Sequence, residues 1–329
     1  MDRMTAPHSS MPEAAPLPLS VQDFWHAEPA SRSSDAPGLW RVAVFLPAIL
    51  ATVALVVAIG VWLAGGGFTG LEYALLALIG ASFSAVALSG SMAVAGLLSL
   101  LRGRRAGTKE ATEPLDVALL VPIYNERPDA VFGNAAAMMD ALPHWGGAHR
   151  YTLYLLSDTQ DDTVAEAEWL AYRALAEQRC DVHYRRRAQN TDRKVGNLAQ
   201  WLGTWGGRHE AMLVLDADSL MSGRAIRHLA DALSADPKAG LIQSVPRLIG
   251  AESLFARSQA FANAAYGPLL ARGLAVWMGR EGNYWGHNAI IRTGAFATCA
   301  GLPKLSGTGA LGGTIKSHDF VEAALMRRA

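Results

Sequence analysis

The chain has 329 residues, of which 29 are basic and 29 acidic, so its formal net charge is zero. This balance argues against a general nucleic-acid-binding protein, which normally carries a basic face, and the length suggests roughly two domains. The two cysteines, Cys180 and Cys299, lie far apart and match no metal or redox spacing. We therefore expect both to be small buried hydrophobic residues, without a disulfide.

The first 110 residues divide into a tail with few large hydrophobic residues and two apolar segments. Residues 1–38 are rich in Pro, Ser and Ala, which predicts a disordered tail. The segments 39–64 and 71–101 are nearly all apolar. Each exceeds the roughly 20 residues that a helix needs to cross the core of a bilayer. We expect two transmembrane helices and a lipid bilayer as partner; a buried hairpin in a soluble protein is the alternative.

Basic residues indicate the orientation of these helices. The short connection 65–70 contains no Lys or Arg, whereas four basic residues directly follow the second segment: Arg102, Arg104, Arg105 and Lys109. Cytoplasmic loops carry the excess of Lys and Arg. The tail and everything after Arg102 are therefore expected in the cytoplasm.

From Asp116 onward, short apolar runs alternate with amphipathic stretches. Strands are expected over 117–121, 153–156, 182–184, 212–215, 241–245 and 288–291. Helices are expected over 128–142, 162–176, 195–202, 223–233 and 320–329. This alternation indicates an α/β fold with a mainly parallel sheet. Helical spacing in 253–270 predicts one more helix, which either packs on the sheet, the commoner arrangement, or lies at a membrane surface.

Polar loops follow four of the expected strands, at 121–126, 157–162, 193–197 and 216–218. In a parallel sheet these loops converge at one edge, where ligands bind. Their carboxylates and amides suit a base and ribose, and Lys194 at a helix start favours phosphate. No P-loop or G-x-G-x-x-G motif is present, which argues against a nucleoside-triphosphate hydrolase and a dinucleotide-binding protein. The sequence therefore favours a nucleotide-diphosphate site.

Asp216 and Asp218 end an apolar strand one residue apart, so their side chains are expected to point the same way. Two such carboxylates suit Mg²⁺ or Mn²⁺ bound together with substrate phosphates. The alternative is that Asp218 caps the helix that begins near Ser222. The surrounding polar loops favour the metal, with Asp216 facing the nucleotide and Asp218 the ion.

Asp319 opens the last expected helix. One interpretation is helix capping, with Glu322 as its capping-box partner. The other is a general base, which takes the proton from an attacking hydroxyl close to a metal–nucleotide site.

The order of the motifs carries more information than any one of them. They are Pro122-x-Tyr124-Asn125-Glu126, Asp158, Lys194-x-Gly196-Asn197, Asp216-x-Asp218, Tyr284-Trp285-Gly286-His287-Asn288 and His318-Asp319. This set resembles the processive family 2 glycosyltransferases, the cellulose-synthase-like group. It resembles more closely the glucans biosynthesis glucosyltransferase H family, which makes osmoregulated periplasmic glucans in Gram-negative bacteria. Ser317-His318-Asp319, in place of the Thr-Glu-Asp of cellulose synthases, favours the periplasmic-glucan relatives.

The resemblance implies a GT-A glycosyltransferase domain over 114–329, which transfers glucose from UDP-glucose to a growing β-linked glucan with inversion at the anomeric carbon. It assigns uridine contacts to Tyr124, Glu126 and Asp158. It assigns the diphosphate and ribose to Lys194 and Asp216, Mg²⁺ or Mn²⁺ to Asp218 beside Asp216, and the base to Asp319. It places Trp285, Gly286, His287 and Asn288 on the acceptor side. His287, a lone histidine, fits a hydrogen-bonding wall residue better than a metal ligand.

The resemblance also implies a multi-pass protein of the bacterial inner membrane, a cytoplasmic catalytic domain and a periplasmic glucan-modifying protein as partner. The group's Gln-x-x-Arg-Trp motif and later membrane helices do not follow Asp319, so we expect a domain truncated at its C-terminus. Two alternatives stay open. One is a synthase of another polysaccharide or glycolipid, such as cellulose, hyaluronan or glucosylceramide, and the other is a nucleotide-sugar-binding sensor without catalysis.

Overall fold

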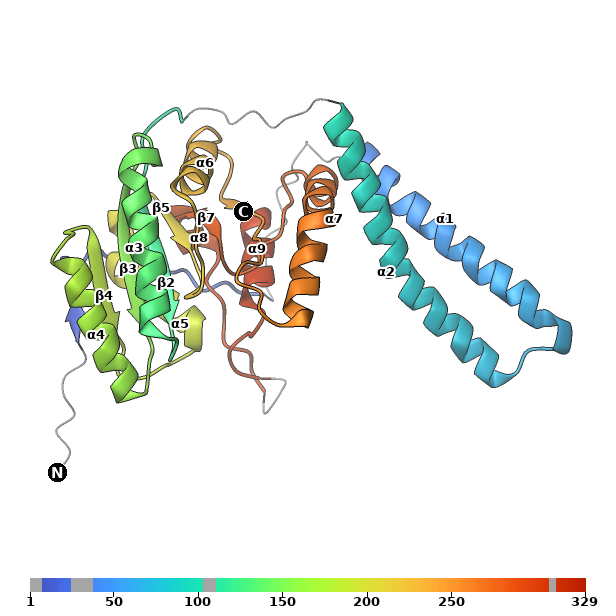
Figure 1. Ribbon diagram of the computed structural model, residues 1–329, viewed down its shortest axis with the longest axis horizontal. Coiled ribbons are helices and arrows are strands. Elements are labelled where there is room, and N and C mark those ends of the chain that lie inside the picture. Colours follow the sequence, from blue (N-terminus) through green and yellow to red (C-terminus); the bar gives the residue numbers. More distant parts are fainter. Residues whose placement is uncertain (1–7, 25–37, 103–110, 308–311) are drawn as a thin grey trace. The chain divides into compact units, whose positions relative to one another are not determined.

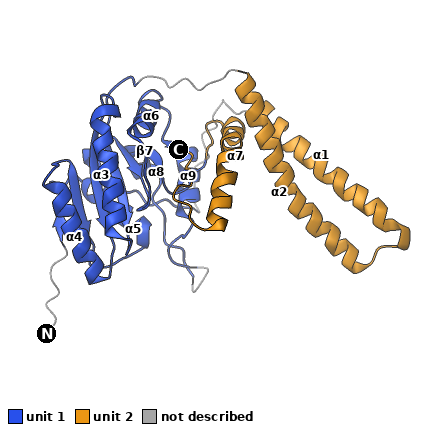
Figure 2. Ribbon diagram, viewed as in Figure 1, with its two compact units in different colours: residues 1–32, 108–244, 283–329 blue, residues 33–107, 245–282 orange. Residues whose placement is uncertain are grey.

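The computed structural model describes residues 8–24, 38–102, 111–307 and 312–329 (Figure 1). They divide into two compact units, coloured separately in Figure 2. Unit 1 comprises the described parts of 1–32, 108–244 and 283–329, and unit 2 those of 33–107 and 245–282. Each unit is described by itself.

Unit 1 is built on one mixed sheet. Its strands are β1 (Ser9–Ser10), β2 (Asp116–Ile123), β3 (Arg150–Ser157), β4 (Val182–Arg186), β5 (Ala211–Val214), β6 (Leu241–Gln243) and β7 (Ala289–Arg292). Their order across the sheet is β1-β4-β3-β2-β5-β7-β6. Strands β4, β3, β2 and β5 are parallel, whereas β7 pairs antiparallel with both β5 and β6. The α/β class with a mainly parallel sheet is confirmed.

Successive strand residues point to opposite faces of the sheet, and both sets are apolar here. Helices therefore cover both faces. Helices α3 (Pro128–Trp145), α4 (Asp162–Ala176) and α6 (Gly223–Ser234) pack on the face that carries Val117, Leu119 and Val121. Helices α5 (Arg193–Trp205), α8 (Thr293–Cys299) and α9 (His318–Arg328) pack on the face that carries Ala118 and Leu120. Burial on both faces explains why the central strands are continuous apolar runs.

The N-terminal segment contradicts the expectation of a disordered tail over part of its length. Strand β1 pairs with β4, and the backbone of Ala15 donates to the carbonyl of Thr204 at 2.8 Å. Leu17 and Leu19 pack against the core on the α5 face. The segment has few large hydrophobic residues, but an extended segment needs few of them when the backbone groups of a folded domain satisfy its own. The prediction is wrong for residues 8–24; the rest of the tail lies outside the described residues.

The two cysteines differ in environment. Both are free thiols, and Cys299 is buried while Cys180 is exposed. The expectation of a buried residue without a disulfide is therefore confirmed for Cys299, and the expected burial is wrong for Cys180. Cys180 lies in the connection between α4 and β4.

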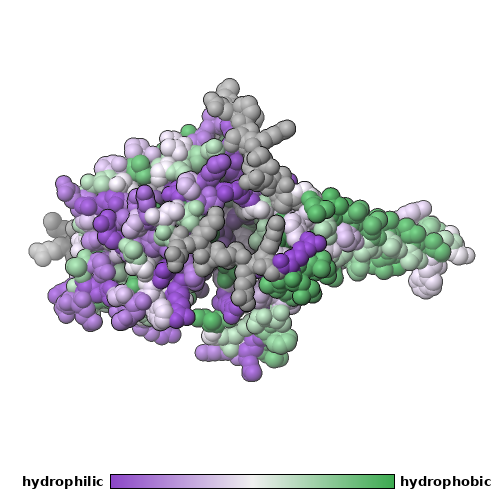
Figure 3. Space-filling model, turned by 90° about the horizontal axis from the view of Figure 1, so that it is seen from above, coloured by the Kyte–Doolittle hydropathy of each residue, from purple (hydrophilic) through white to green (hydrophobic). Residues whose placement is uncertain are grey.

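Unit 2 contains the two long apolar helices, α1 (Gly38–Leu63) and α2 (Gly70–Leu101), joined by the short 3₁₀ turn η1 (Ala64–Gly66). Thr69 and Glu72 form the capping box that starts α2. Both helices are long and apolar enough to cross a membrane, and only 11% and 0% of their most apolar windows are buried. Figure 3 shows the hydrophobic surface along them. They therefore differ from the buried core helices of a soluble protein.

Helix α7 (Leu254–Met278) packs against α2 within unit 2, so the commoner arrangement expected for 253–270, packing on the sheet, is wrong. Two glycines make the contact. A Cβ on Gly96 would lie 2.1 Å from the carbonyl oxygen of Leu269, and one on Gly273 would lie 2.0 Å from that of Met92. The two backbones touch directly, as helices in lipid often do through small residues.

We expect Gly273→Ala to destabilise unit 2 by about 1–3 kcal/mol, the usual cost of overpacking, because the new methyl group meets a backbone carbonyl. The matched control is Gly90→Ala on α2, where a Cβ meets nothing within 4 Å. Helix propensity should make that variant as stable as the wild type or slightly more stable. Thermal unfolding in detergent measures both, and equal melting temperatures would contradict the close contact.

Candidate active site

Strands β2, β3, β4 and β5 end at the same edge of the sheet, and polar side chains collect in the loops that follow. In the parallel pairing, Leu120 of β2 lies opposite Tyr154 of β3 and Val214 of β5. The loops after these strands therefore meet, as expected for the ligand edge of an α/β sheet. The segments 284–288 and 317–319 join them.

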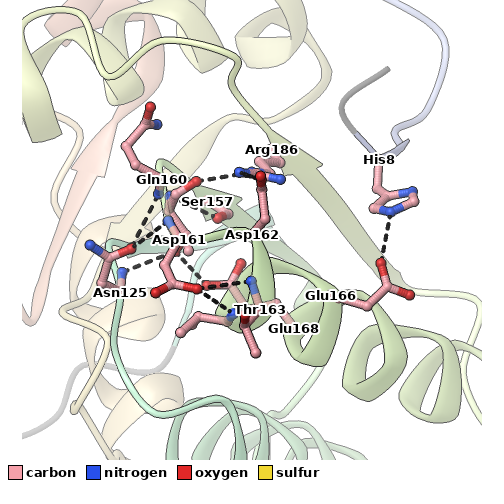
Figure 4. Close-up of polar contacts among 12 residues, drawn as sticks. His8, Asn125, Ser157, Gln160, Asp161, Asp162, Thr163, Glu166, Glu168 and Arg186 are labelled. Carbon is pink, nitrogen blue, oxygen red and sulfur yellow. Dashed lines mark hydrogen bonds and ion pairs between the residues drawn. The ribbon is translucent and has the colours of Figure 1, made fainter. Parts of the chain in front are cut away.

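Asn125 connects the loops after β2 and β3 (Figure 4). Its backbone N–H donates to Thr159 Oγ1 at 2.9 Å, and its side-chain oxygen accepts from the N–H groups of Gln160 at 3.1 Å and Asp161 at 3.4 Å. Its φ of 59° lies in the left-handed region, which Asn tolerates better than most residues. The loop that carries Tyr124 and Glu126 is therefore held on the end of β3.

Tyr124 and Glu126, the first two predicted uridine contacts, lie at this edge. The Glu126 carboxylate accepts the N–H of Tyr124, and the Tyr124 side chain is half-exposed. Partial burial raises the pKa of Glu126 above its ordinary value, and the negative charges of Glu168 and Asp218 act in the same direction. The influence of Asp218 places this loop within electrostatic reach of the carboxylate pair after β5.

Asp158, the third predicted uridine contact, is buried and forms a two-pronged ion pair with Arg187. The guanidinium Nε and one terminal nitrogen donate to its two oxygens at 2.5 and 2.6 Å. Arg187 also donates to the carbonyls of Thr191 and Arg193, both at 3.1 Å. Arg187 is not among the predicted site residues, although it ends a run of three arginines directly after an expected strand.

The Lys194-x-Gly196-Asn197 motif has a structural explanation at each position. A Cβ on Gly196 would lie 2.1 Å from the carbonyl oxygen of Thr191, so the chain entering α5 leaves room only for glycine. The Asn197 amide donates to the carbonyl of Leu156 at 2.8 Å and accepts from Arg185. The start of α5 is therefore fixed to the end of β3.

Lys194 points from this helix start to the end of β5. Its ammonium donates to the Asp216 carboxylate and, at 2.8 Å, to the carbonyl of Gly286. The two residues before it, Asp192 and Arg193, both have positive φ, of 57° and 52°. Strained backbone of this kind is common where a side chain must be aimed at a site.

Asp216 and Asp218 sit in a turn in which Ser219 bonds back to Asp216 through both its hydroxyl and its N–H, each at 3.0 Å. Ser222 caps α6, accepting the N–H of Ala225 at 3.2 Å. The alternative that Asp218 caps this helix is therefore wrong. Asp218 is exposed, whereas Lys194 already binds the carboxylate of Asp216.

The segment 284–288 brings the predicted acceptor side to the same place. Gly286 has a φ of 82°, and a Cβ there would lie 3.4 Å from Asp319 Oδ2. His287 Nε2 lies 3.9 Å from Asp216 Oδ2. Gln243, which the sequence analysis missed, supports the segment by accepting from the N–H of Trp285 at 3.1 Å and donating to the carbonyl of His287 at 3.0 Å. The segment thus connects Lys194, Asp216 and Asp319.

Several buried polar atoms in this segment have no hydrogen-bond partner within the described part of the chain: Tyr284 Oη, His287 Nδ1 and Asn288 Oδ1. Buried polar atoms are normally satisfied, so this group of unpaired atoms in one segment calls for polar partners other than those of the described chain. Burial raises the pKa of Tyr284 well above its ordinary value, which keeps its hydroxyl a donor.

Asp319 lies in the first turn of α9. The N-cap is Ser317, and Glu322 forms an ion pair with His318 at 3.1 Å. The capping-box interpretation of Asp319 and Glu322 is therefore wrong. The half-buried Asp319 carboxylate remains directed at Gly286.

The described residues contain no group of three or more His, Cys, Asp or Glu side chains arranged to hold a metal ion. Mg²⁺ and Mn²⁺ sites often use only one or two carboxylates, with substrate phosphates supplying the remaining ligands. The exposed Asp218, beside the partly exposed Asp216, fits an ion that arrives with a diphosphate.

A mainly parallel sheet with an Asp-x-Asp pair, a lysine and a further carboxylate at one edge defines a GT-A glycosyltransferase domain. Residues 118–299 match the family model described as "Glycosyl transferase family 2". The chain belongs to this family.

The curated relatives extend the comparison beyond this domain. The chain is 44% identical over 325 residues to "Glucans biosynthesis glucosyltransferase H" of Shewanella baltica strain OS155, which covers 98% of the chain and 44% of the relative. It is also 44% identical over 338 residues to the protein of that name in Rhodopseudomonas palustris strain BisA53, with 99% and 47% covered. The chain thus spans less than half the length of these relatives.

Among solved structures, the mannosyltransferase PcManGT of Pyrobaculum calidifontis, in complex with GDP-Man and Mn²⁺, matches 63% of this chain and 55% of its own. The TM-score is 0.38 and the sequence identity 21%.

We expect Arg187→Met to destabilise unit 1 by about 3–5 kcal/mol, because it leaves the buried Asp158 carboxylate without its partner. Adding Asp158→Asn should restore part of the loss. The control is Arg150→Met, whose ion pair with Asp116 is exposed and should contribute less than about 1 kcal/mol. Urea unfolding measures all three variants, and similar effects of the two arginine substitutions would contradict the importance of the buried pair.

Proposed function

We propose that this chain carries the catalytic domain of an inverting glucosyltransferase, which uses UDP-glucose to extend the β-linked backbone of osmoregulated periplasmic glucans. The observation that carries the proposal is one series of contacts at the sheet edge: Lys194 binds Asp216 and Gly286, and Gly286 lies against Asp319. It is supported by 44% identity to curated glucosyltransferases over 98% of the chain.

In this proposal the donor lies along the ends of β3, β2 and β5. Tyr124, Glu126 and Asp158 contact uridine, and Lys194 and Asp216 bind the diphosphate and ribose. The Lys194 ammonium, at the start of α5, supplies positive charge where the phosphates would lie. The hydrogen bonds of Asn125 and Asn197 hold the loop after β2 and the start of α5 in place before the donor arrives.

Asp218, with Asp216 beside it, would hold Mg²⁺ or Mn²⁺. Such an ion supplies positive charge that stabilises the departing diphosphate. Lys194 adds a second positive charge to the same leaving group. The exposure of Asp218 and the absence of a helix-capping role leave its carboxylate available for this purpose.

Asp319 would act as the general base, accepting the proton of the acceptor hydroxyl as that oxygen attacks the anomeric carbon. Gly286 has no side chain that would fill the space beside the carboxylate. The unpaired polar atoms of Tyr284, His287 and Asn288 offer hydrogen bonds to sugar hydroxyls, and Trp285 offers an apolar surface. In this arrangement Trp285, Gly286, His287 and Asn288 line the acceptor side.

We further propose that α1 and α2 cross the bacterial inner membrane of a multi-pass protein. Helices that are apolar on all sides and largely exposed need lipid around them. A cytoplasmic position for the catalytic domain follows from the basic residues after α2. Of these, Arg102 lies over the Trp40 ring, 5.2 Å from its centroid, while Arg104, Arg105 and Lys109 lie outside the described residues. A periplasmic glucan-modifying partner remains part of the proposal.

We expect Asp319→Asn to lower glucose transfer by about 10²–10⁴-fold, the usual contribution of a general base, while UDP binding is retained. The assay is turnover of radiolabelled UDP-glucose by the protein at its full genomic length. The control is Asp140→Asn, an exposed carboxylate on α3. Turnover at the wild-type rate would refute the assignment of the base. Wild-type binding without turnover would favour a sensor, and preference for another sugar donor would favour a different polymer or glycolipid.

We expect Asp218→Asn to weaken Mn²⁺-supported UDP binding by roughly ten- to a hundredfold, because a charged ligand of the ion is lost. Titration calorimetry with and without EDTA measures the effect, and the metal-free affinity should change little. Asp140→Asn again serves as control. If Asp218→Asn bound UDP and Mn²⁺ as tightly as the wild type, the metal would have to be held elsewhere.

A further inference from the structure

Arg185, near the end of β4, is a buried cation whose direct partners carry no charge. Its side chain donates to the amide oxygen of Gln200 at 2.5 Å and to that of Asn197, and its residue is 5% exposed. Its Nε is buried and has no hydrogen-bond partner within the described residues. Buried charges are normally paired with an opposite charge, so this environment is unusual.

Arg185 does not avoid this unpaired burial by losing its proton. Burial, together with the positive charge of Arg187, lowers the pKa of Arg185 to about 10, which still leaves it charged at neutral pH. Asp158 lies within electrostatic reach of Arg185, but Arg187 binds both of its oxygens. The guanidinium therefore has no carboxylate of its own in the described part of unit 1.

A pocket of about 650 Å³ opens beside this arginine, between the end of β4 and the outer side of α5. Its lining includes Arg185, Arg186, Arg187, Gln189, Thr191 and Gln200. None of the residues proposed for the donor, the metal or the acceptor lines it. Asp192, a carboxylate in its wall, is bound by Lys304 at 3.1 Å and by Thr314.

We infer that this pocket binds a phosphate-class oxyanion, separately from the nucleotide-sugar site. The anion supplies the missing countercharge of Arg185, and guanidinium groups are well suited to bind phosphate oxygens. The pocket is larger than a phosphate ion, so a phosphomonoester also fits. The polar side chains of Gln189 and Thr191 offer further hydrogen bonds.

The position of Arg185 connects this anion to the active site. Arg185 holds the Asn197 amide, which in turn binds the carbonyl of Leu156 at the end of β3. Asn197 lies one turn after Lys194 on α5. Neutralising the charge of Arg185 would therefore change the hydrogen bonds that hold the start of α5, which carries the proposed phosphate-binding Lys194.

The test uses the variant Gln200→Glu, which places a carboxylate on the group that already accepts from Arg185. We titrate the full chain, in neutral detergent and phosphate-free buffer, with inorganic phosphate and with glycerol 3-phosphate. The wild type should bind at least one of them, and tighter binding of one or the other distinguishes free from esterified phosphate. Gln200→Glu should weaken binding at least tenfold and raise the melting temperature.

The control is Gln178→Glu, an exposed residue just after α4, which should leave anion binding and melting temperature unchanged. Arg185→Gln provides a second variant, which should likewise weaken binding at least tenfold. The inference is overturned if neither anion binds at millimolar concentration, or if Gln200→Glu binds as the wild type does. It is also overturned if saturating UDP displaces the anion, since the pocket would then belong to the donor site.

Discussion

The site depends on one constraint, the parallel register of β4, β3, β2 and β5. Because these strands run in the same direction, their ends and the loops that follow meet along a single edge of the sheet. Two asparagine amides then fix these ends to one another. Asn125 joins the loops after β2 and β3, and Asn197 joins the start of α5 to β3. These connections position the loop that carries Tyr124 and Glu126 and the helix start that carries Lys194.

The carboxylates at this edge fall into two groups. Asp158 and Asp216 are already bound, the first by Arg187 and the second by Lys194. Asp218 is exposed, and the Asp319 carboxylate lies beside Gly286, which has no side chain. The first pair organises the site in the absence of ligands, because a buried or partly buried carboxylate needs a cation. The second pair keeps its oxygens available, which is what a metal ligand and a general base require.

Sequence patterns located most elements of unit 1 and the motifs that surround its ligand edge, but they missed Arg187 and Gln243. Both act through single side chains on partners far along the chain: Arg187 on Asp158, and Gln243 on the 285–288 segment. Gln243 belongs to no local motif, and the run of three arginines that ends at Arg187 does not indicate which carboxylate that arginine binds. The predicted packing of α7 on the sheet was wrong for a related reason. An amphipathic pattern is the same whether the apolar face of the helix meets a sheet or another helix, and here α7 meets α2 through Gly273.

The sequence by itself determined the class of fold, the two apolar helices and the order of the catalytic motifs, because hydrophobic period, capping residues and strand ends are local properties. Only the tertiary structure decided which side chains are partners. It inserted β7 antiparallel between β5 and β6, ordered residues 8–24 against β4, α5 and the region of α8, and left Arg185 without a countercharge. Each of these depends on contacts between residues far apart in the chain, and local composition does not encode such contacts.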